Sequence, residues 1–259
     1  KSHNHYFDFW KKYPEELLNV DFLKNSDSLS ASDIKKIKNL MSDEQSKREF
    51  ELVAAFRVNR NIEYMQGFKF RINEQYFEYF LNLPDNPSFV DGGGYEGETV
   101  LKFIKKYPIY DHIFYFEPCE DSMLKSKINL RNVKNITYYQ VGLWHEKNYL
   151  HFNSNLGNAN FIDENGNTEI RVDSLDNIIG RLNQKIDFIK LDVEGAEYNA
   201  LIGAEEIIVK HKPKIAICVY HNSLDFIRIP ELVLSYCSDY EIYFRHYTQG
   251  VYESVMFFV

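Results

Sequence analysis

Short apolar runs alternate with amphipathic stretches between residues 88 and 219. The runs with the β-branched and aromatic content of strands lie at 88–90, 112–116, 136–141, 186–191 and 214–219. Between them, apolar residues recur at helical spacing at about 98–107, 122–130 and 196–210. Strands that alternate with helices in this way predict a parallel sheet with both faces covered.

The alternation ends near the C-terminus. Residues 240–245 and 254–259 are two further apolar runs, and only a short turn around Gly250 separates them. A parallel crossover needs about a dozen residues, so this pair must be antiparallel. We therefore expect an α/β, Rossmann-like fold whose mostly parallel seven-stranded sheet ends in an antiparallel hairpin. The runs at 149–152 and 168–172 predict an inserted pair of strands.

The N-terminal part is helical and polar in pattern. Helical spacing is found at 15–18, 34–40 and 50–56, and Ser30 or Ser32-Asp33 can cap the second of these helices. Pro84-Asp85-Asn86-Pro87 then punctuates the chain. We assign residues 1–71 to a helical extension that acts as a lid or an oligomerisation arm, and 72–259 to the main domain.

Composition excludes several classes of protein. The 259 residues carry 30 Lys and Arg against 38 Asp and Glu, a net charge of −8 that disfavours a nucleic-acid partner. No apolar run approaches the roughly 20 residues of a membrane-spanning helix. Three cysteines without CxxC spacing suit a reducing compartment, and no signal-peptide pattern begins the chain. We expect a cytoplasmic protein, and its aromatic N-terminal helices are compatible with a homodimer.

A glycine-rich turn follows the first predicted strand. Four of the 12 glycines fall within 92–97, where Gly92, Gly94 and Gly97 satisfy GxGxxG. Glu117 lies 20 residues after Gly97, at the end of the second strand. This spacing is the fingerprint of a dinucleotide site and leaves a nicotinamide-dependent oxidoreductase open.

The charges at this turn favour a different cofactor. Asp91, Glu96 and Glu98 surround it and would repel a pyrophosphate. S-adenosylmethionine has an ammonium and a sulfonium group, and its ribose diol suits a carboxylate such as Glu117. We therefore favour the methyl donor. A third interpretation is a non-catalytic protein in which the turn binds no ligand and Asp91 is a cap.

Two further groups follow the fourth and fifth strands. Asp192 and Glu194 share one side of a strand tip. They can bind a substrate hydroxyl, ligate magnesium or cap the following helix, and for Glu197 we favour capping. Magnesium stays an open alternative, but no third ligand is identifiable, so we assign no metal-binding residues. In Val219-Tyr220-His221-Asn222, His221 can accept a hydroxyl proton, and His246 can belong to a second polar cluster. Each histidine can equally be a hydrogen-bonded structural residue.

With these motifs in place, the sequence resembles the FkbM-type S-adenosylmethionine-dependent methyltransferases over about 72–259, which implies a class I methyltransferase fold. The resemblance rests on blocks in order: Phe89–Thr99, Phe116-Glu117-Pro118, Val172–Asp176, Ile189–Glu197, and Lys212–Ala216 with Tyr220-His221. Many members carry Gly-Ala where this chain has Gly93-Gly94, and we expect the second glycine to loosen the turn.

The resemblance implies roles for individual residues. The turn would form the methionine and ribose wall, Glu117 would bind the diol, and Gln140–Leu143 would lie near the adenine. The cofactor set is then Asp91, Gly92, Gly93, Gly94, Tyr95, Gly97, Thr99, Glu117, Pro118, Val141, Gly142 and Asp192. His221, Asp192 and Glu194 are the expected catalytic residues, and Tyr220, His221 and His246 the expected substrate contacts.

The expected reaction is methyl transfer to a hydroxyl of a small or carbohydrate acceptor. By family analogy, we expect a sugar of a cell-surface polysaccharide or its activated precursor. Carboxylates accept hydroxyl protons and tyrosine rings stack on sugar faces, which fits such an acceptor. N-methylation stays an open alternative.

Overall fold

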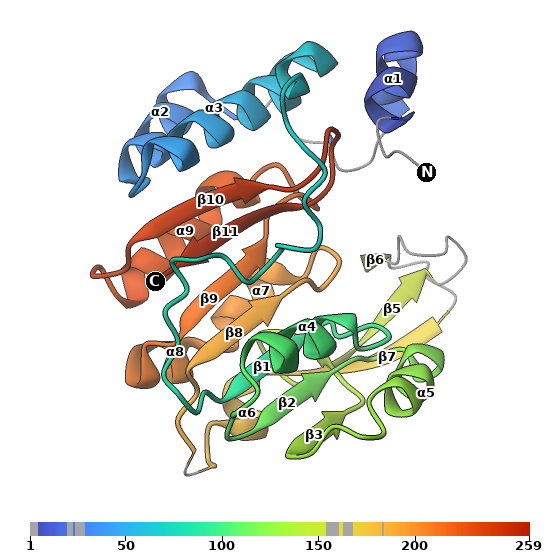
Figure 1. Cartoon of the computed structure of the whole chain (residues 1–259), viewed down its shortest axis with the longest axis vertical. Coiled ribbons are helices and arrows are strands. Elements are labelled where there is room, and N and C mark those ends of the chain that lie inside the picture. The colour runs from blue at the N-terminus through green and yellow to red at the C-terminus, as the bar shows by residue number, and fades with distance from the viewer. Residues whose placement is uncertain (1–4, 20–22, 24–28, 154–160, 163–167, 183) are drawn as a thin grey trace. The chain divides into compact units, whose positions relative to one another are not determined.

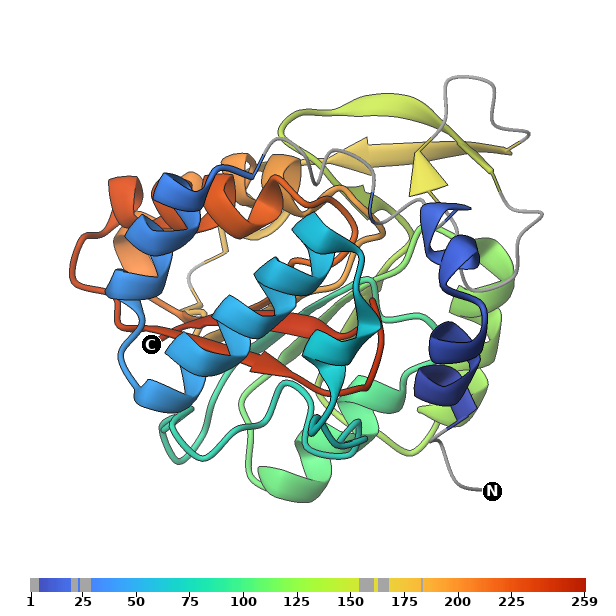
Figure 2. The ribbon, with the colours of Figure 1, turned by 90° about the horizontal axis from the view of Figure 1, so that it is seen from above.

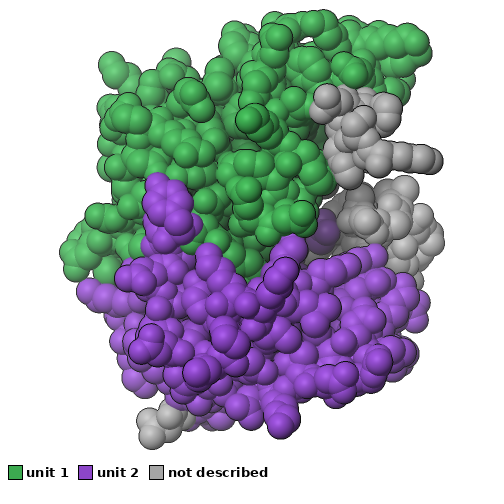
Figure 3. Space-filling view, viewed as in Figure 1, with its two compact units in different colours: residues 1–78, 218–259 green, residues 79–217 purple. Residues whose placement is uncertain are grey.

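The structure is a computed structural model that describes residues 5–19, 23, 29–153, 161–162, 168–182 and 184–259. The chain forms two compact units (Figure 3). One unit comprises residues 79–217, and the other comprises residues 1–78 together with 218–259. Each unit is described here by itself.

Unit 79–217 contains the parallel strands that the apolar runs predict (Figure 1). These are β1 (Phe89–Gly92), β2 (Ile113–Phe116), β3 (Ile136–Tyr139), β8 (Phe188–Leu191) and β9 (Lys214–Cys218), which ends at the unit boundary. Their order is β9-β8-β1-β2-β3. The helices are α4 (Glu98–Lys106), α5 (Glu120–Asn129), α6 (Leu175–Ile179), α7 (Glu197–Ile202) and α8 (Glu205–His211).

The core of this sheet is aromatic. Phe89 of β1 is stacked on Phe188 of β8 at 5.1 Å and on Phe103 of α4 at 4.5 Å between ring centroids. All residues of β1, β2 and β8 are buried, which explains why their sequences are mostly apolar rather than alternating, with Asp91 and Lys190 as the charged exceptions.

The prediction of a single helix at 196–210 is wrong, because the structure has two helices there, α7 and α8. The chain breaks at Gly203, where an added Cβ would lie 2.0 Å from the carbonyl oxygen of Trp144. The close approach of this loop leaves no room for a side chain at residue 203.

A second, smaller sheet confirms the inserted strand pair. It has the order β4-β7-β5-β6, with β4 (Gly142–Leu143), β5 (Asn148–Asn153), β6 (Phe161–Ile162) and β7 (Thr168–Asp173). Strands β5 and β7 are antiparallel, with Leu150 opposite Ile170.

The other unit combines the N-terminal helices with the C-terminal hairpin. Its elements are α1 (His5–Lys12), the 3₁₀ helices η1 (Pro14–Asn19) and η4 (Ile62–Met65), α2 (Ala31–Leu40), α3 (Glu44–Asn59), α9 (Asp225–Tyr236), β10 (Ile242–His246) and β11 (Ser254–Phe258). Strands β10 and β11 are antiparallel, as expected. The full order β10-β11-β9-β8-β1-β2-β3 confirms the mostly parallel seven-stranded sheet.

Helix α3 crosses the hairpin (Figure 2). Phe50 of α3 contacts Phe226 of α9 and Phe244 of β10, with ring centroids 5.6 and 5.4 Å apart. At the start of α3, Asp43 caps the helix and binds buried Arg245, with Oδ2 2.7 Å from Nη2. Ser30 caps α2 by accepting from the Asp33 N–H, which confirms the expected cap. Among the described residues, no helix is long and apolar enough to cross a membrane.

Candidate functional site

The carboxyl edge of the parallel sheet has a switch point between β1 and β8. From β1 the chain proceeds through β2 and β3, whereas β8 and β9 lie on the other side of β1. Open α/β sheets bind ligands at such points. The turns after β1 and β8 meet there, because the Asp192 N–H donates to the Gly92 carbonyl oxygen at 3.1 Å.

The turn after β1 folds over the end of β2. The N–H groups of Gly93 and Gly94 both donate to the carbonyl oxygen of Phe116 at 3.0 Å. Gly93 has a φ of 72°, and an added Cβ would lie 1.8 Å from the carbonyl oxygen of Asp192. This position therefore requires glycine.

Gly94 is a glycine for another reason. An added Cβ would lie 2.1 Å from Cε2 of Tyr115, whose ring occupies the space of a methyl group. The Tyr115 hydroxyl donates to the carbonyl oxygen of Tyr95 at 2.6 Å and fixes this ring. The expectation that Gly94 loosens the turn is therefore wrong, since β2 supplies the missing bulk.

Glu117 joins the turn to the end of β2. Its Oε2 accepts from the Tyr95 N–H at 2.9 Å, and its Oε1 accepts from the Cys119 N–H at 2.8 Å. Burial raises the pKa of Glu117 to about 7, although these two N–H groups and the charge of Lys190 act in the opposite direction. Its charge can thus change near neutral pH.

A buried ion pair lies beneath the same turn. The Lys190 Nζ is 3.1 Å from Oδ1 of Asp91, and the exposed fractions of the two side chains are 2% and 0%. The same ammonium donates to the carbonyl oxygens of Gly92 at 3.1 Å and Gly93 at 2.6 Å. Burial raises the pKa of Asp91, and Lys190 opposes that effect. Asp91 therefore acts on the turn through Lys190.

The segment expected near the adenine borders the turn. Val141 is buried, and Gly142 begins β4. A Cβ added to Gly92 would lie 2.9 Å from Cδ1 of Leu143, so this segment packs against the end of β1. The other predicted cofactor residues are nearby in the chain: Gly97 precedes α4, Thr99 lies in its first turn, and Pro118 precedes α5.

The turn after β8 has an unusual backbone. Glu194 has a φ of 54° and Gly195 a φ of 96°, so two successive residues are left-handed. Glu197, which is fully buried at the start of α7, accepts from the N–H groups of Val193 at 2.9 Å and Gly195 at 3.0 Å. The N-cap of α7 is Ala196, without a side-chain cap bond, so Glu197 binds the preceding turn and does not cap the helix as expected.

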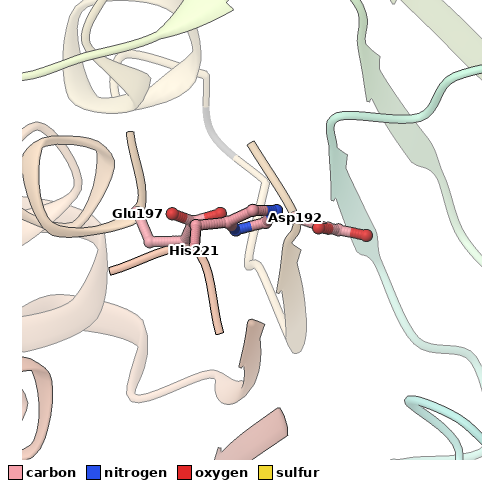
Figure 4. Close-up of side chains that lie close together, drawn as sticks. All are labelled: Asp192, Glu197 and His221. Carbon is pink, nitrogen blue, oxygen red and sulfur yellow. The ribbon is translucent and has the colours of Figure 1, made fainter. Parts of the chain in front are cut away.

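Figure 4 shows the side chains of Asp192, Glu197 and His221. Asp192 directly follows β8 and Glu197 begins α7, within unit 79–217. His221 follows β9 and belongs to the unit of residues 1–78 and 218–259. Within that unit its ring lies 4.1 Å from the ring of Tyr220, and both side chains are largely buried.

His246 has structural partners in the same unit. It is fully buried on β10, with Nδ1 2.8 Å from Oγ of Ser254 and Nε2 3.3 Å from Oγ1 of Thr248. Burial lowers its pKa to about 3, so the ring is neutral at neutral pH. Because both nitrogens have partners, we do not retain His246 as a substrate contact.

Sequence reasoning gave no role to Lys190 or Arg57. A lysine inside the buried run Phe188–Leu191 is a detectable signal, since a buried charge requires partners. Arg57 lies in an ordinary helical pattern and is fully buried. Its partners become apparent only in the folded chain.

Residues 88–249 match the Methyltransferase FkbM domain, so the chain belongs to the FkbM methyltransferase family. The fold is similar to the crystal structure of methyltransferase FkbM from Methylobacillus flagellatus KT, with a TM-score of 0.76 and 25% identity. That similarity covers 88% of this chain but 58% of the other.

A weaker similarity exists to Aeropyrum pernix fibrillarin, solved with natively bound S-adenosyl-L-methionine. The TM-score is 0.44 and the identity 14%, over 68% of this chain and 69% of that chain. No curated protein matches the chain.

The buried pair predicts a measurable stability effect. Lys190→Met should lower the free energy of unfolding by about 3–5 kcal/mol at pH 8, because it leaves the Asp91 carboxylate buried without its partner. The double variant Lys190→Met with Asp91→Asn should recover a large part of the loss, since it removes the buried charge. Urea denaturation of the three proteins tests this. Equal stability of wild type and Lys190→Met would contradict the importance of the pair.

Proposed function

We propose that this protein is a methyltransferase that uses S-adenosylmethionine to methylate a hydroxyl group. The observation that carries the proposal is the hydrogen bond from the Tyr95 N–H to Glu117. It joins the glycine turn after β1 to the acid after β2, within the domain that matches FkbM methyltransferases. This is the place at which open α/β sheets bind ligands.

The residues at the turn fit this cofactor. When bound, S-adenosylmethionine supplies an electrophilic methyl group on a sulfonium. Each Glu117 oxygen accepts one N–H and has a further lone pair for a ribose hydroxyl. The acids around the turn favour the cationic groups of the donor, and Val141 with Gly142 offers an apolar border for the adenine.

We assign removal of the hydroxyl proton to His221 or Asp192, and a hydrogen bond to the acceptor to Glu194. Strands β8 and β9 are parallel neighbours, so the chain leaves both at the carboxyl edge of the sheet. The larger part of the rate would come from holding the hydroxyl in line with the methyl group. Removal of the hydroxyl proton would add about 10²–10⁴-fold.

The acceptor class is proposed from chemistry. Carboxylates and an imidazole accept hydroxyl protons, and Tyr220 offers a ring beside His221. A polyhydroxylated acceptor suits such groups, so we propose a sugar of a cell-surface polysaccharide or its activated precursor. Product analysis by NMR distinguishes an O-methyl from an N-methyl product.

Calorimetry tests the cofactor. We expect S-adenosylhomocysteine to bind with a micromolar dissociation constant, and NAD(H) and NADP(H) not to bind. The reason is the acidic border of the turn, which attracts an amino group and repels a pyrophosphate. Binding of a dinucleotide alone would instead support an oxidoreductase.

Glu117 predicts a pH dependence of this binding. Its pKa of about 7 means that the ionised form, which accepts ribose hydroxyls best, is lost as pH falls through 7. The dissociation constant of S-adenosylhomocysteine should then rise by up to about tenfold per pH unit below 7. Calorimetry from pH 5.5 to 8.5 measures this, with Glu117→Gln as the control that flattens the profile.

The unliganded protein should respond to pH in the opposite direction. Because the pKa of Glu117 is higher in the folded chain than in the unfolded one, the native state binds more protons between about 4.5 and 7. The contribution of Glu117 to the free energy of unfolding is present below that range and is lost as pH rises through it. For binding, a dissociation constant of S-adenosylhomocysteine that does not change with pH in wild type would contradict the proposed contact of Glu117 with the ribose.

Variants of the proposed bases test the chemistry. His221→Ala or Asp192→Asn should lower the single-turnover rate by about 10²–10⁴-fold, because the hydroxyl proton loses its acceptor. Affinity for S-adenosylhomocysteine should change little in His221→Ala. The measurement is transfer of labelled methyl to a panel of activated sugars and polysaccharides. An unchanged rate in both variants would eliminate the two residues as bases.

A further inference from the structure

The guanidinium of Arg57 connects helix α3 to two loops of its unit. Its Nη2 donates to the carbonyl oxygens of Tyr220 at 2.8 Å and Val251 at 3.2 Å, and its Nη1 donates to Oγ of Ser223 at 3.2 Å. Tyr220 and Ser223 flank His221 in the loop after β9, and Val251 lies between β10 and β11. One side chain thus fixes both ends of the short segment that carries His221.

The surroundings of Arg57 are specific for a planar cation. The side chain is fully buried, and its guanidinium lies 4.9 Å from the centroid of the Phe226 ring. Burial lowers its pKa to about 9, while the charge of Asp225 acts in the opposite direction, so it remains charged at neutral pH. A buried cation is costly unless it is hydrogen-bonded, which makes this geometry restrictive.

We propose that Arg57 is a positioning residue for methyl transfer: from the N-terminal helices, it holds the backbone of residues 220–223 so that His221 is presented in one orientation. The inference rests on the proposed role of His221. It gives α3 a part in catalysis, beyond the lid or oligomerisation arm expected for residues 1–71. The bonds join α3 to the segment directly, through the carbonyl oxygen of Tyr220 and the hydroxyl of Ser223.

Lysine cannot replace arginine in this geometry. Its single ammonium lacks the fork that reaches a hydroxyl and two carbonyl groups at once. Arg57→Lys should therefore keep the charge but release one or more of the bonds to residues 220–223. Ser223→Ala is a milder variant that removes the Nη1 acceptor and keeps the arginine.

Arg245 offers a matched control in the same unit. It is also fully buried, and its guanidinium binds Asp43 and, at 2.7 Å, Oγ of Ser46 at the start of α3. Arg245→Lys should lower the melting temperature as Arg57→Lys does. It disturbs the packing of α3 on β10 rather than the bonds to the segment that carries His221.

Kinetics separate positioning from stability. Arg57→Lys should lower kcat by about 10–100-fold and Ser223→Ala by about 2–10-fold, while Arg245→Lys keeps kcat per folded molecule within about twofold of wild type. In a His221→Ala background, Arg57→Lys should cause little further loss, because residues that act as a unit are not additive. An equal loss of kcat with and without His221, or an equal loss in Arg57→Lys and Arg245→Lys, would overturn the proposal.

Imidazole NMR gives a test without an acceptor. With His221→Ala identifying the signal, the ring resonances of His221 should shift or broaden in Arg57→Lys and Ser223→Ala but not in Arg245→Lys. Unchanged His221 resonances in both loop variants would also overturn the proposal. Binding of S-adenosylhomocysteine to wild type is measured in parallel. Its absence refutes the proposed function. Normal binding together with unchanged His221 resonances in Arg57→Lys and Ser223→Ala refutes only the role of Arg57.

Discussion

The carboxyl edge of the parallel sheet depends on the interactions of the Lys190 ammonium. This ammonium neutralises Asp91 in the core of the sheet. It also fixes the direction of the chain as it leaves β1, because it donates hydrogen bonds to the carbonyl oxygens of two successive glycines. A glycine-rich turn has little conformational preference of its own, so an external constraint must select its shape. Here that constraint is buried, which protects it from competition with water.

The bonds that Glu117 accepts complete this constraint from the end of β2. Lys190 holds the carbonyl groups and Glu117 holds the Tyr95 N–H, so opposite polar groups of the same backbone are bound by opposite charges. Such preorganisation reduces the entropy that a ligand must lose when it binds. The cost is a carboxyl group whose protonation is sensitive to pH near neutrality.

Local rules predict much of this fold because many of its signals are local. The hairpin of β10 and β11 follows from the short turn at Gly250, and the start of α2 follows from the side chain of Ser30. The need for glycine at 203 could not be predicted, since it depends on the carbonyl group of Trp144, about sixty residues earlier in the chain. The same holds for Arg57, whose acceptors are more than 160 residues away in sequence.

Among the candidate site residues, too, some follow from local sequence and others depend on distant parts of the chain. Glu117 and the glycines could be found from spacing, because a strand, a turn and a helix impose that spacing on any ligand site of this type. His246 had the right residue type at a strand end, but side-chain partners on β11 and in the loop before it decide its environment. Position along a strand therefore predicts the edge at which a residue lies, while its burial is decided by tertiary packing.

The contact between Gly94 and Tyr115 also limits how this sequence can diverge. An alanine at 94 and the tyrosine ring at 115 compete for the same volume, so either substitution alone meets a barrier that the pair together avoids. A lineage that acquires a smaller residue at 115 first opens a void at the turn, which alanine at 94 can then fill. The two positions are thus expected to change together rather than independently.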